Sequence, residues 1–212
     1  VVQPDGRIVL AGACFNGTNN DFCAVRYMPG GSLDTSFGVG GKVMTAVGSS
    51  DDDVHAVTLQ PDGKLVLAGG CVVVNNFDFC TIRYLSDGTL DTSFGANGKV
   101  ITAFGSGADA ARSLVLQADG KIVLGGDCFN VTTSDFCALR YLANGTLDAS
   151  FGTNGKVITP VGSDDDFSSA LALQPDGKML HAGSCRVVGI NFDFCAVRYS
   201  TDGTLDTTFG TS

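Results

Sequence analysis

The chain has few basic residues, no tryptophan and no long apolar run. Only 13 of its 212 residues are Lys or Arg, against 22 Asp and Glu, so the net charge is −9. The basic residues are scattered along the chain, which argues against a nucleic-acid partner, because such a partner requires a clustered basic surface. The longest apolar run, near residues 65–74, is about half of the roughly 20 residues that span a bilayer, so no membrane insertion is expected.

Zinc-binding patterns are also missing, because no Cys-x-x-Cys knuckle with nearby histidines occurs. The eight cysteines instead form four local pairs, which are Cys14/Cys23, Cys71/Cys80, Cys128/Cys137 and Cys185/Cys195. Recurring pairs suit disulfides in an oxidising environment, and buried free thiols in a cytosolic protein are the alternative. We therefore predict four disulfides and a secreted or cell-surface location.

Four copies of one unit make up the chain. The anchor Gln-x-Asp-Gly recurs at 57-residue intervals, at Gln3, Gln60, Gln117 and Gln174. Self-similarity of this length predicts stacked supersecondary units with a continuous core, so residues 1–212 are expected to form a single repeat domain. Because Val1 falls in the middle of the first copy and no signal peptide is visible, we expect that copy to be truncated and the chain to be a segment of a longer protein.

The third copy predicts four short strands joined by glycine-rich turns. Strands are expected over 99–104, 111–117, 121–125 and 135–141. Residues 111–117 alternate between apolar and polar, and Asp119-Gly120 supplies the positive φ that a two-residue hairpin turn needs. No segment shows helical periodicity, so the predicted class is all-β.

Four antiparallel strands in every unit are typical of a β-propeller blade. A β-solenoid is the rival, but its coils are usually much shorter and lack repeated Asp-Gly hairpins. Strands that are apolar on both faces, such as 122–124, suit a sheet covered on both sides by neighbouring blades. We predict a β-propeller-type array of four-stranded antiparallel blades with one disulfide each. Cys128 and Cys137 are expected to face each other across a hairpin and to close the variable loop 129–134 at its base.

Arginine and aspartate recur at fixed positions. Each arginine shares a strand face with the phenylalanine four residues before it, and an aspartate follows eight residues after it. The sets are Phe22, Arg26 and Asp34; Phe79, Arg83 and Asp91; Phe136, Arg140 and Asp148; and Phe194, Arg198 and Asp206. A guanidinium among aromatic rings requires a carboxylate, so we predict four structural ion pairs. A ring of ligand-binding arginines is the alternative.

Three phrases together resemble the bacterial delta-60 repeat. They are Leu-Asp-Thr-Ser-Phe-Gly at 33–38 and 90–95, Gln-Pro-Asp-Gly-Lys at 60–64 and 174–178, and Asp-Phe-x-Ala-x-Arg-Tyr at 21–27 and 135–141. The resemblance spans essentially the whole chain. It implies a propeller-like repeat of a large secreted or cell-surface bacterial protein of mostly uncharacterised function, and it supplies no catalytic residues. The cysteine pairs depart from the usual pattern of that repeat.

The hairpin loops differ between copies and fall into two classes. Residues 15–18 resemble 129–132, and residues 72–77 resemble 187–192 despite one inserted residue. A longer period of two units therefore lies over the single repeat, which indicates duplication of a two-blade unit. Because the ends leave a repeat incomplete, we expect the segment to belong to a longer ring or to assemble through its ends with copies of itself.

These loops also hold the candidate ligand-binding residues. Two acidic runs are candidates for calcium: Asp51, Asp52 and Asp53, and Asp164, Asp165 and Asp166. A solvated acidic loop is the alternative, because the complete Asp-x-Asp-x-Asp-Gly pattern is absent. Aromatic rings beside amides suit a sugar or a protein partner, and they single out Phe15, Asn16, Phe129, Asn130, Asn75 and Asn191. For the neighbouring Phe77 and Phe192, packing between blades is the alternative.

The expected function is a non-enzymatic extracellular module for binding or self-assembly at the cell surface. Its partners would be a protein, a glycan or copies of itself, and no cofactor is expected apart from calcium. No nucleophile, base and orienting acid recur at a plausible spacing, and His55 and His181 have no histidine counterparts in the other copies. The alternative is a carbohydrate-active or other hydrolytic propeller with its site on a loop-rich rim.

Overall fold

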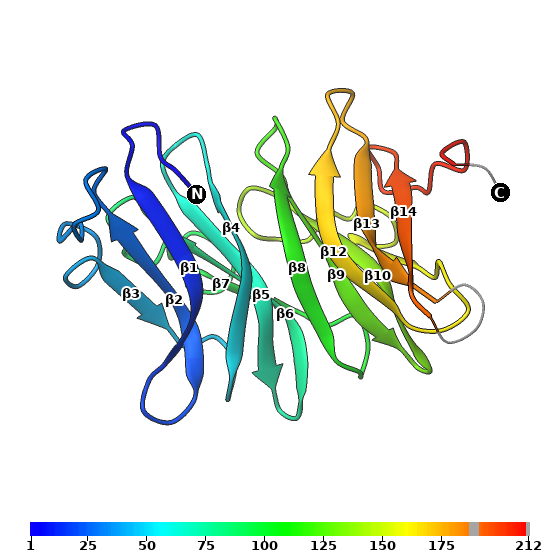
Figure 1. The fold of residues 1–212 in the computed structure, drawn as a ribbon, viewed down its shortest axis with the longest axis horizontal. Coiled ribbons are helices and arrows are strands. Elements are labelled where there is room, and N and C mark those ends of the chain that lie inside the picture. Colours follow the sequence, from blue (N-terminus) through cyan, green and yellow to red (C-terminus); the bar gives the residue numbers. More distant parts are fainter. Residues whose placement is uncertain (187–190, 211–212) are drawn as a thin grey trace. The chain divides into compact units, whose positions relative to one another are not determined.

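The computed structural model describes residues 1–186 and 191–210, and every regular element in these residues is a β-strand (Figure 1). The strands form four antiparallel sheets, two of four strands and two of three. The chain divides into two compact units, Val1–Thr102 and Ala103–Ser212, and each holds two successive sheets. The predicted all-β fold of propeller-type blades is confirmed. None of the described residues forms a helix long and apolar enough to cross a membrane.

The first unit contains blades 1 and 2. Blade 1 consists of β1 (Ile8–Phe15), β2 (Asn20–Tyr27) and β3 (Lys42–Thr45). Blade 2 consists of β4 (Asp52–Leu59), β5 (Leu65–Val73), β6 (Asn76–Tyr84) and β7 (Lys99–Thr102). In both blades the strands pair in chain order, as expected of short antiparallel connections.

The second unit contains blades 3 and 4. Blade 3 consists of β8 (Asp109–Leu116), β9 (Ile122–Asn130), β10 (Thr133–Tyr141) and β11 (Lys156–Thr159). Blade 4 consists of β12 (Asp166–Leu173), β13 (Met179–Cys185) and β14 (Asp193–Tyr199). The first strand of each of the blades 2, 3 and 4 carries a bulge, at His55, Arg112 and Ser169 respectively.

The short strand predicted over 99–104 belongs to the blade before the one expected. β7 pairs with β6, with Ile82 opposite Lys99, so it closes blade 2 instead of opening blade 3. The reason is a turn that folds back over β6. Asp91 N donates to Arg83 O at 2.8 Å and Arg83 N donates to Gly98 O at 3.0 Å, which returns the chain to the sheet that it has just left.

The Asp-Gly turns are longer than the predicted two residues. Gln117 N donates to Lys121 O at 2.9 Å, and three residues lie between this pair. Within the turn only Gly120 has positive φ, at 83°. The carboxylate of Asp119 instead accepts the amide of Lys121 at 3.2 Å. The motif is therefore a three-residue loop whose glycine relieves backbone strain.

The core of each unit lies between its two blades. In the first unit, Phe22 and Phe37 of blade 1 pack in one cluster with Leu67 and Tyr84 of blade 2. The hydroxyl of Tyr84 bonds to Thr45 of blade 1 at 2.6 Å. The second unit repeats this contact, because Tyr199 donates to Thr159 at 2.7 Å. Burial raises the pKa of both tyrosines to about 12, so both hydroxyls keep their protons.

Candidate functional site

Every blade holds one cluster of cations around a buried aspartate. The Nε atom of the strand arginine donates to this carboxylate at 2.7 Å in blade 1, 2.8 Å in blades 2 and 3, and 2.9 Å in blade 4. A second cation reaches the same oxygen from the preceding turn, and the four are Arg7, Lys64, Lys121 and Lys178. The predicted ion pairs are confirmed, and each carboxylate has a second cationic partner that was not predicted.

Each arginine stacks on an aromatic ring that the sequence did not single out. The guanidinium of Arg26 lies 4.6 Å from the ring centre of Phe37, in the turn after β2. Blades 2, 3 and 4 repeat this stacking at 4.5, 4.7 and 4.8 Å on Phe94, Phe151 and Phe209. Arg26 Nη1 also donates to Ser86 O of blade 2 at 2.5 Å, and Arg140 donates to Thr201 O of blade 4 at 2.5 Å. The clusters of Arg26 and Arg140 therefore join the two blades of each unit. These contacts favour the structural role of the arginines over the alternative of a ligand-binding role.

These carboxylates are held in the ionised form. A hydrogen bond from Ser36, with Arg26 beside it, lowers the pKa of Asp34 to about 2. Burial alone would raise the pKa of Asp91 and Asp148, but their serine and cationic partners outweigh it and lower both values to about 2. Lys178 and Thr208 lower the pKa of Asp206 as well. All four aspartates are therefore fully charged near neutral pH.

All eight cysteines form the four predicted disulfides, with Cα atoms 5.7–5.9 Å apart. The bonds are Cys14–Cys23, Cys71–Cys80, Cys128–Cys137 and Cys185–Cys195. Each bond joins the two strands of one hairpin and closes the base of its loop, as predicted.

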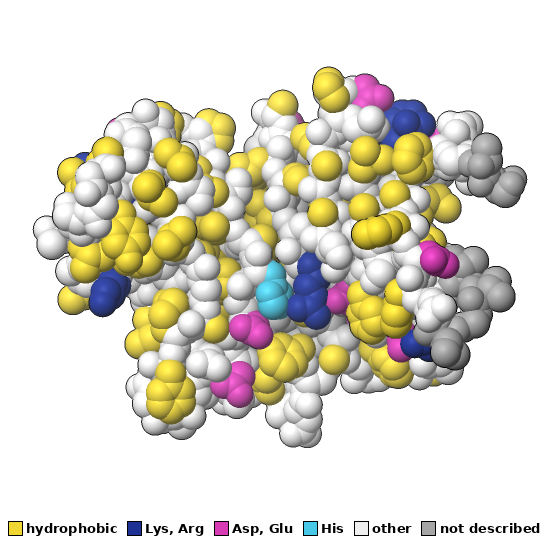
Figure 2. Space-filling model, viewed as in Figure 1, with side chains coloured by type: hydrophobic (Ala, Val, Ile, Leu, Met, Phe, Trp, Pro, Cys, Tyr) yellow, Lys and Arg dark blue, Asp and Glu magenta, His cyan; other side chains and the backbone are white. Residues whose placement is uncertain are grey.

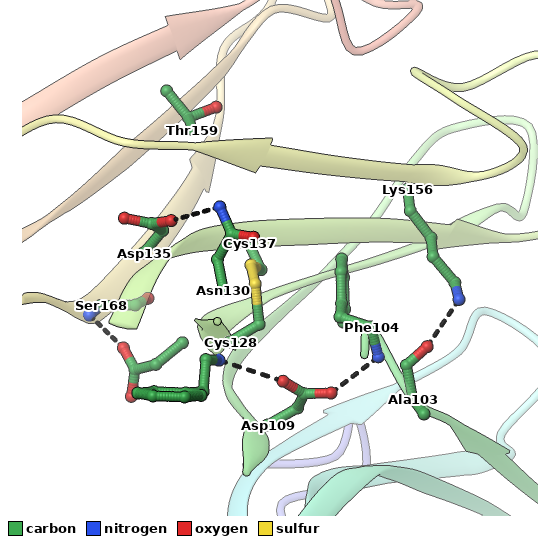
Figure 3. Close-up of a disulfide and its surroundings, with 12 residues drawn as sticks. Ala103, Phe104, Asp109, Cys128, Asn130, Asp135, Cys137, Lys156, Thr159 and Ser168 are labelled. Carbon is green, nitrogen blue, oxygen red and sulfur yellow. Dashed lines mark hydrogen bonds between the residues drawn. A yellow bond between two sulfur atoms is a disulfide. The ribbon is translucent and has the colours of Figure 1, made fainter. Parts of the chain in front are cut away.

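The expectation that the two cysteines of a bond face each other across the hairpin is wrong. In blade 3, Cys128 lies opposite Asp135, and Cys137 lies opposite Gly126. The bond therefore runs diagonally across the β9–β10 hairpin (Figure 3). One diagonal of a twisted antiparallel pair is short enough for a disulfide, and this is the physical reason for the difference.

The same correction applies to the other blades. In blade 2, Cys71 lies opposite Asp78, and Cys80 lies opposite Gly69, so Cys80 is offset by two residues from its bonded partner. The residues opposite the second cysteine are glycines in all four blades, namely Gly12, Gly69, Gly126 and Gly183. Residues directly opposite each other in a sheet share a face, so a glycine leaves this face clear for the diagonal bond.

The acidic runs bind backbone amides. Asp52 accepts the N–H groups of Val47 and Gly48 at 2.7 and 3.0 Å, and Asp166 does the same in blade 4 at the same distances. In blade 3 this place is taken by Asp109, which accepts the amides of Phe104 at 2.6 Å and Phe129 at 3.2 Å (Figure 3). Each of these aspartates thus closes the loop that precedes the first strand of its blade.

The neighbouring aspartates connect two blades. Asp51 accepts the amide of Asn20, on the β1–β2 hairpin of blade 1, at 2.9 Å. In the second unit Asp165 accepts the amide of Ser134, on the β9–β10 hairpin, also at 2.9 Å. This duplicated contact is what the two-unit period in the sequence encodes, and sequence reasoning missed it.

The calcium site stays a prediction. Asp53 is exposed, and Asp164 pairs with Arg186 at 2.5 Å. Over residues 1–186 and 191–210, no group of three or more His, Cys, Asp or Glu side chains is placed to hold a metal ion. Burial, with repulsion from Asp21, raises the pKa of Asp52.

Asn16 and Asn130 occupy equivalent places, and each is exposed but bonded to an aspartate of its own hairpin. Asn16 Nδ2 donates to Asp21 at 2.9 Å, and Asn130 Nδ2 donates to Asp135 at 3.2 Å (Figure 3). The Oδ1 atom of Asn16 also accepts the amide of Thr18 at 2.8 Å. Both predicted ligand-binding amides thus hold their own loops.

The two phenylalanines beside them differ in exposure. Phe15 is 68% exposed, whereas Phe129 is 39% exposed. A Cβ atom added to Gly107 would lie 2.6 Å from Phe129, so this ring covers the backbone of the preceding loop. Of this pair, Phe15 is the ring that is open to a partner.

The hairpin tips of blades 2 and 3 are strained. Val74 and Val131 have φ angles of 63° and 65°, and each is the centre of a γ-turn closed by an N–H···O bond of 2.8 or 2.7 Å. A β-branched residue at positive φ is an outlier that costs of order 1–3 kcal/mol. In blade 1 the equivalent residue is Gly17. Both valines are mostly exposed, at 79% and 85%.

The remaining predicted residues lie at the tips of blades 2 and 4. Asn75 is exposed next to the strained valine of blade 2, and Asn191 is exposed in blade 4. Phe192 packs against Phe167 at 5.5 Å and lies 4.8 Å from the guanidinium of Arg186, and both contacts lie within blade 4, so they do not test the alternative of packing between blades. The rest of the predicted loop, residues 187–190, lies outside the described residues.

A polar cluster between blades 3 and 4 was missed by sequence reasoning. Ser168 Oγ lies 2.6 Å from His181 Nε2, and the Ser168 amide donates to Asp127. The imidazole stacks on Phe136 at 4.7 Å, and burial lowers the pKa of His181 to about 4. His181 is fully buried and Ser168 is 7% exposed, so this pair is closed to a substrate. The available signal was that copies one to three place leucine at the position of His181.

A family model described as "Domain of unknown function (DUF5122) beta-propeller" matches residues 3–37, 60–94, 117–151 and 174–209. The chain belongs to the DUF5122 β-propeller family. Each DUF5122 match runs from an anchor glutamine to the phenylalanine below the arginine, so it contains one disulfide and one cation cluster. A search of curated proteins found no match.

Proposed function

We propose that this DUF5122 chain is a non-enzymatic extracellular module that binds or assembles at the cell surface. The observation that carries the proposal is the division between repeated and variable residues. The disulfides and cation clusters recur in every copy and are engaged in packing. The hairpin tips vary, and their bases are closed by disulfides. Four disulfides support an oxidising location, and the resemblance to delta-60 repeats fits a secreted or surface protein.

The partner is proposed to be a protein or a glycan that contacts the hairpin tips. Phe15, Val74 and Val131 expose apolar surface at three tips. An exposed apolar side chain on a hairpin tip suits contact with a partner, and an exposed ring suits a sugar or a protein. Disulfide closure lowers the entropy that such loops lose on binding.

Binding to a glycan array and to intact bacterial cells tests this proposal. We expect a Phe15→Ala, Val74→Ser, Val131→Ser variant to lose most of the binding, because it removes the exposed apolar side chains. Phe129→Ala is the matched control, since that ring covers its own loop and its removal should affect stability more than binding. Equal binding by the triple variant and the wild type would refute the assignment of the tips.

Calcium binding by the acidic runs is part of the proposal. Its support is the electrostatic repulsion between one acidic run and a neighbouring carboxylate: burial, together with the charges of Asp166 and Asp165, raises the pKa of Asp135. A divalent cation would relieve such repulsion. Calcium should then raise Tm relative to EDTA, and Asp165→Asn should reduce the shift. An unchanged Tm with saturating calcium would exclude the site.

The hydrolytic alternative gains no support from the described residues, where the Ser168–His181 pair is buried. Turnover on a glycan panel, lost when an acidic loop is neutralised, would favour it.

A further inference from the structure

Each blade has two faces that are used differently in packing. The leucine face carries residue 10 of blade 1 and its equivalents, Leu67 in blade 2 and His181 in blade 4. The phenylalanine face carries residue 22 and its equivalents, Phe136 in blade 3 and Phe194 in blade 4. The two sets of side chains alternate along the strands, so they lie on opposite sides of the sheet.

Within each unit the phenylalanine face of one blade packs on the leucine face of the next. In the second unit, Phe136 of blade 3 stacks on His181 of blade 4. A Cβ atom added to Gly183 would lie 3.0 Å from the tip of the same ring, so this glycine gives the ring its space. In the first unit, Phe22 and Leu67 belong to one core cluster.

The same two faces are uncovered on the end blades. Phe194 of blade 4 is 102% exposed, whereas Phe22 and Phe136 are fully buried. Leu10 of blade 1 is 54% exposed, whereas Leu67 and His181 are fully buried. Apolar side chains are visible over β1 and β2 and again over β13 and β14 (Figure 2). Two faces built for the same kind of contact are therefore open, one of each type.

We propose that the phenylalanine face of blade 4 docks on the leucine face of blade 1 in a second copy of this chain. This deepens the assembly part of the proposed function by naming its surfaces and its partner. The occupant follows from the contact inside each unit, because a blade of the same repeat covers each equivalent face there. The contact is head to tail, so it generates a ring or a filament of copies.

The leucine face of blade 1 has room for the incoming ring. It carries a groove of about 930 Å³ lined by Leu10, Gly12, Val25 and Met44, among others. A Cβ atom added to Gly12 would meet nothing within 4 Å, and Gly12 is the equivalent of Gly183. Phe194 of the second copy is therefore expected to lie over Gly12, as Phe136 lies over Gly183.

A polar contact should accompany the apolar one. The guanidinium groups of Arg26 and Arg140 each donate to a backbone carbonyl of the next blade in their unit. Both side chains are 5% exposed, but that of Arg198 in blade 4 is 21% exposed. By equivalence, Arg198 donates to the carbonyl of Pro29 in the second copy.

Sedimentation velocity over a range of protein concentrations tests the docking. The wild type should form species larger than a monomer, and Phe194→Asp or Leu10→Asp should each weaken association at least tenfold. Both residues are exposed in the isolated chain, so circular dichroism and Tm should stay close to the wild-type values. Val131→Asp, at the exposed hairpin tip of blade 3 and on neither proposed docking face, is the control that should associate normally.

Mixing the two variants separates this interface from a symmetric one. Phe194→Asp retains an intact blade 1 face, and Leu10→Asp retains an intact blade 4 face, so the mixture should form one-to-one dimers and nothing larger. A mixture that stays monomeric would overturn the proposal, as would a wild type that is monomeric at about 0.1 mM, since both results leave these faces to another occupant. Loss of glycan or cell binding in the tip variant with normal self-association tests the proposed function independently.

Discussion

Single residues in this chain act where one copy departs from the others. Gly17 is an example, because it avoids the strain of a positive φ that Val74 and Val131 carry at the equivalent positions of blades 2 and 3. His181 is another, because the equivalent residues are leucines that need no hydrogen-bonding partner. In both cases a substitution borrowed from another copy provides a natural test.

Val131→Gly should raise the free energy of unfolding by about 1 kcal/mol. Relief of about 1–3 kcal/mol of strain is partly offset by about 0.5–1 kcal/mol of glycine backbone entropy. The urea midpoint measures the change, and Val131→Thr, which keeps the β-branch, should show no gain. A lower midpoint for the glycine variant would mean that the tip is not strained.

His181→Leu should remove a pH dependence of stability between pH 6.5 and 4. The unfolded histidine takes up a proton near pH 6.5, but burial holds the folded pKa at about 4, so the wild type loses stability as the pH falls through this window. A shift of this size corresponds to about 3 kcal/mol. The groups packed around the ring are Ser168, Tyr199 and Phe136, and Asp127 is bonded to the Ser168 amide.

Urea unfolding of both proteins at pH 7 and pH 4.5 gives the comparison. Every aspartate is common to the wild type and the variant. The difference between the two proteins in how the free energy of unfolding changes with pH therefore reports the titration of His181. Identical pH profiles would show that the imidazole is accessible to protons in the folded protein.

At the scale of the element, the hairpin is the unit that the disulfide stabilises. Removal of the bond by Cys128→Ala with Cys137→Ala should lower the free energy of unfolding by about 3 kcal/mol, the chain-entropy value for a loop of about ten residues. Urea unfolding measures the change. Full reduction should lower the free energy of unfolding of the wild type by more than this double substitution does, because reduction breaks all four bonds and the oxidised variant retains three. A variant with wild-type stability would mean that the strand pairing alone holds the hairpin.

Local pattern was enough to predict the strands and the cysteine pairs, because alternation and Asp-Gly turns are properties of a few consecutive residues. It did not show which sheet the strand at 99–102 joins, since that depends on the fold-back of the turn after β6. The stacking of Arg26 on Phe37 was missed for the same reason. Acidic runs that accept amides and acidic runs that bind cations have the same composition, so the role of Asp51 required coordinates.

At the scale of the whole molecule, four equivalent cation clusters respond to acid together. Asp34, Asp91 and Asp148 have pKa values of about 2 in the folded chain against an ordinary value of 3.8. A depressed folded pKa stabilises the protein above about pH 4, and this contribution is lost as the pH falls towards 2. Tm should therefore drop steeply between pH 4 and 2, beyond the change due to His181.

Asp148→Asn is the test variant, and Asp62→Asn, at an exposed aspartate of a turn, is the control. The test variant should have a lower Tm at pH 7 and a shallower fall in acid, because one of the clusters is already neutralised. The control should follow the wild type. Equal acid profiles for all three proteins would remove the clusters as the cause.

The diagonal disulfide at the base of each hairpin uncouples loop length from strand register. Blade 4 has one extra residue between its cysteines, yet Cys195 lies opposite Gly183 just as Cys137 lies opposite Gly126. Insertions at these tips are thus mechanically isolated from the sheet, so evolution can lengthen them freely, and a foreign epitope grafted there should be displayed without disturbing the scaffold beneath it.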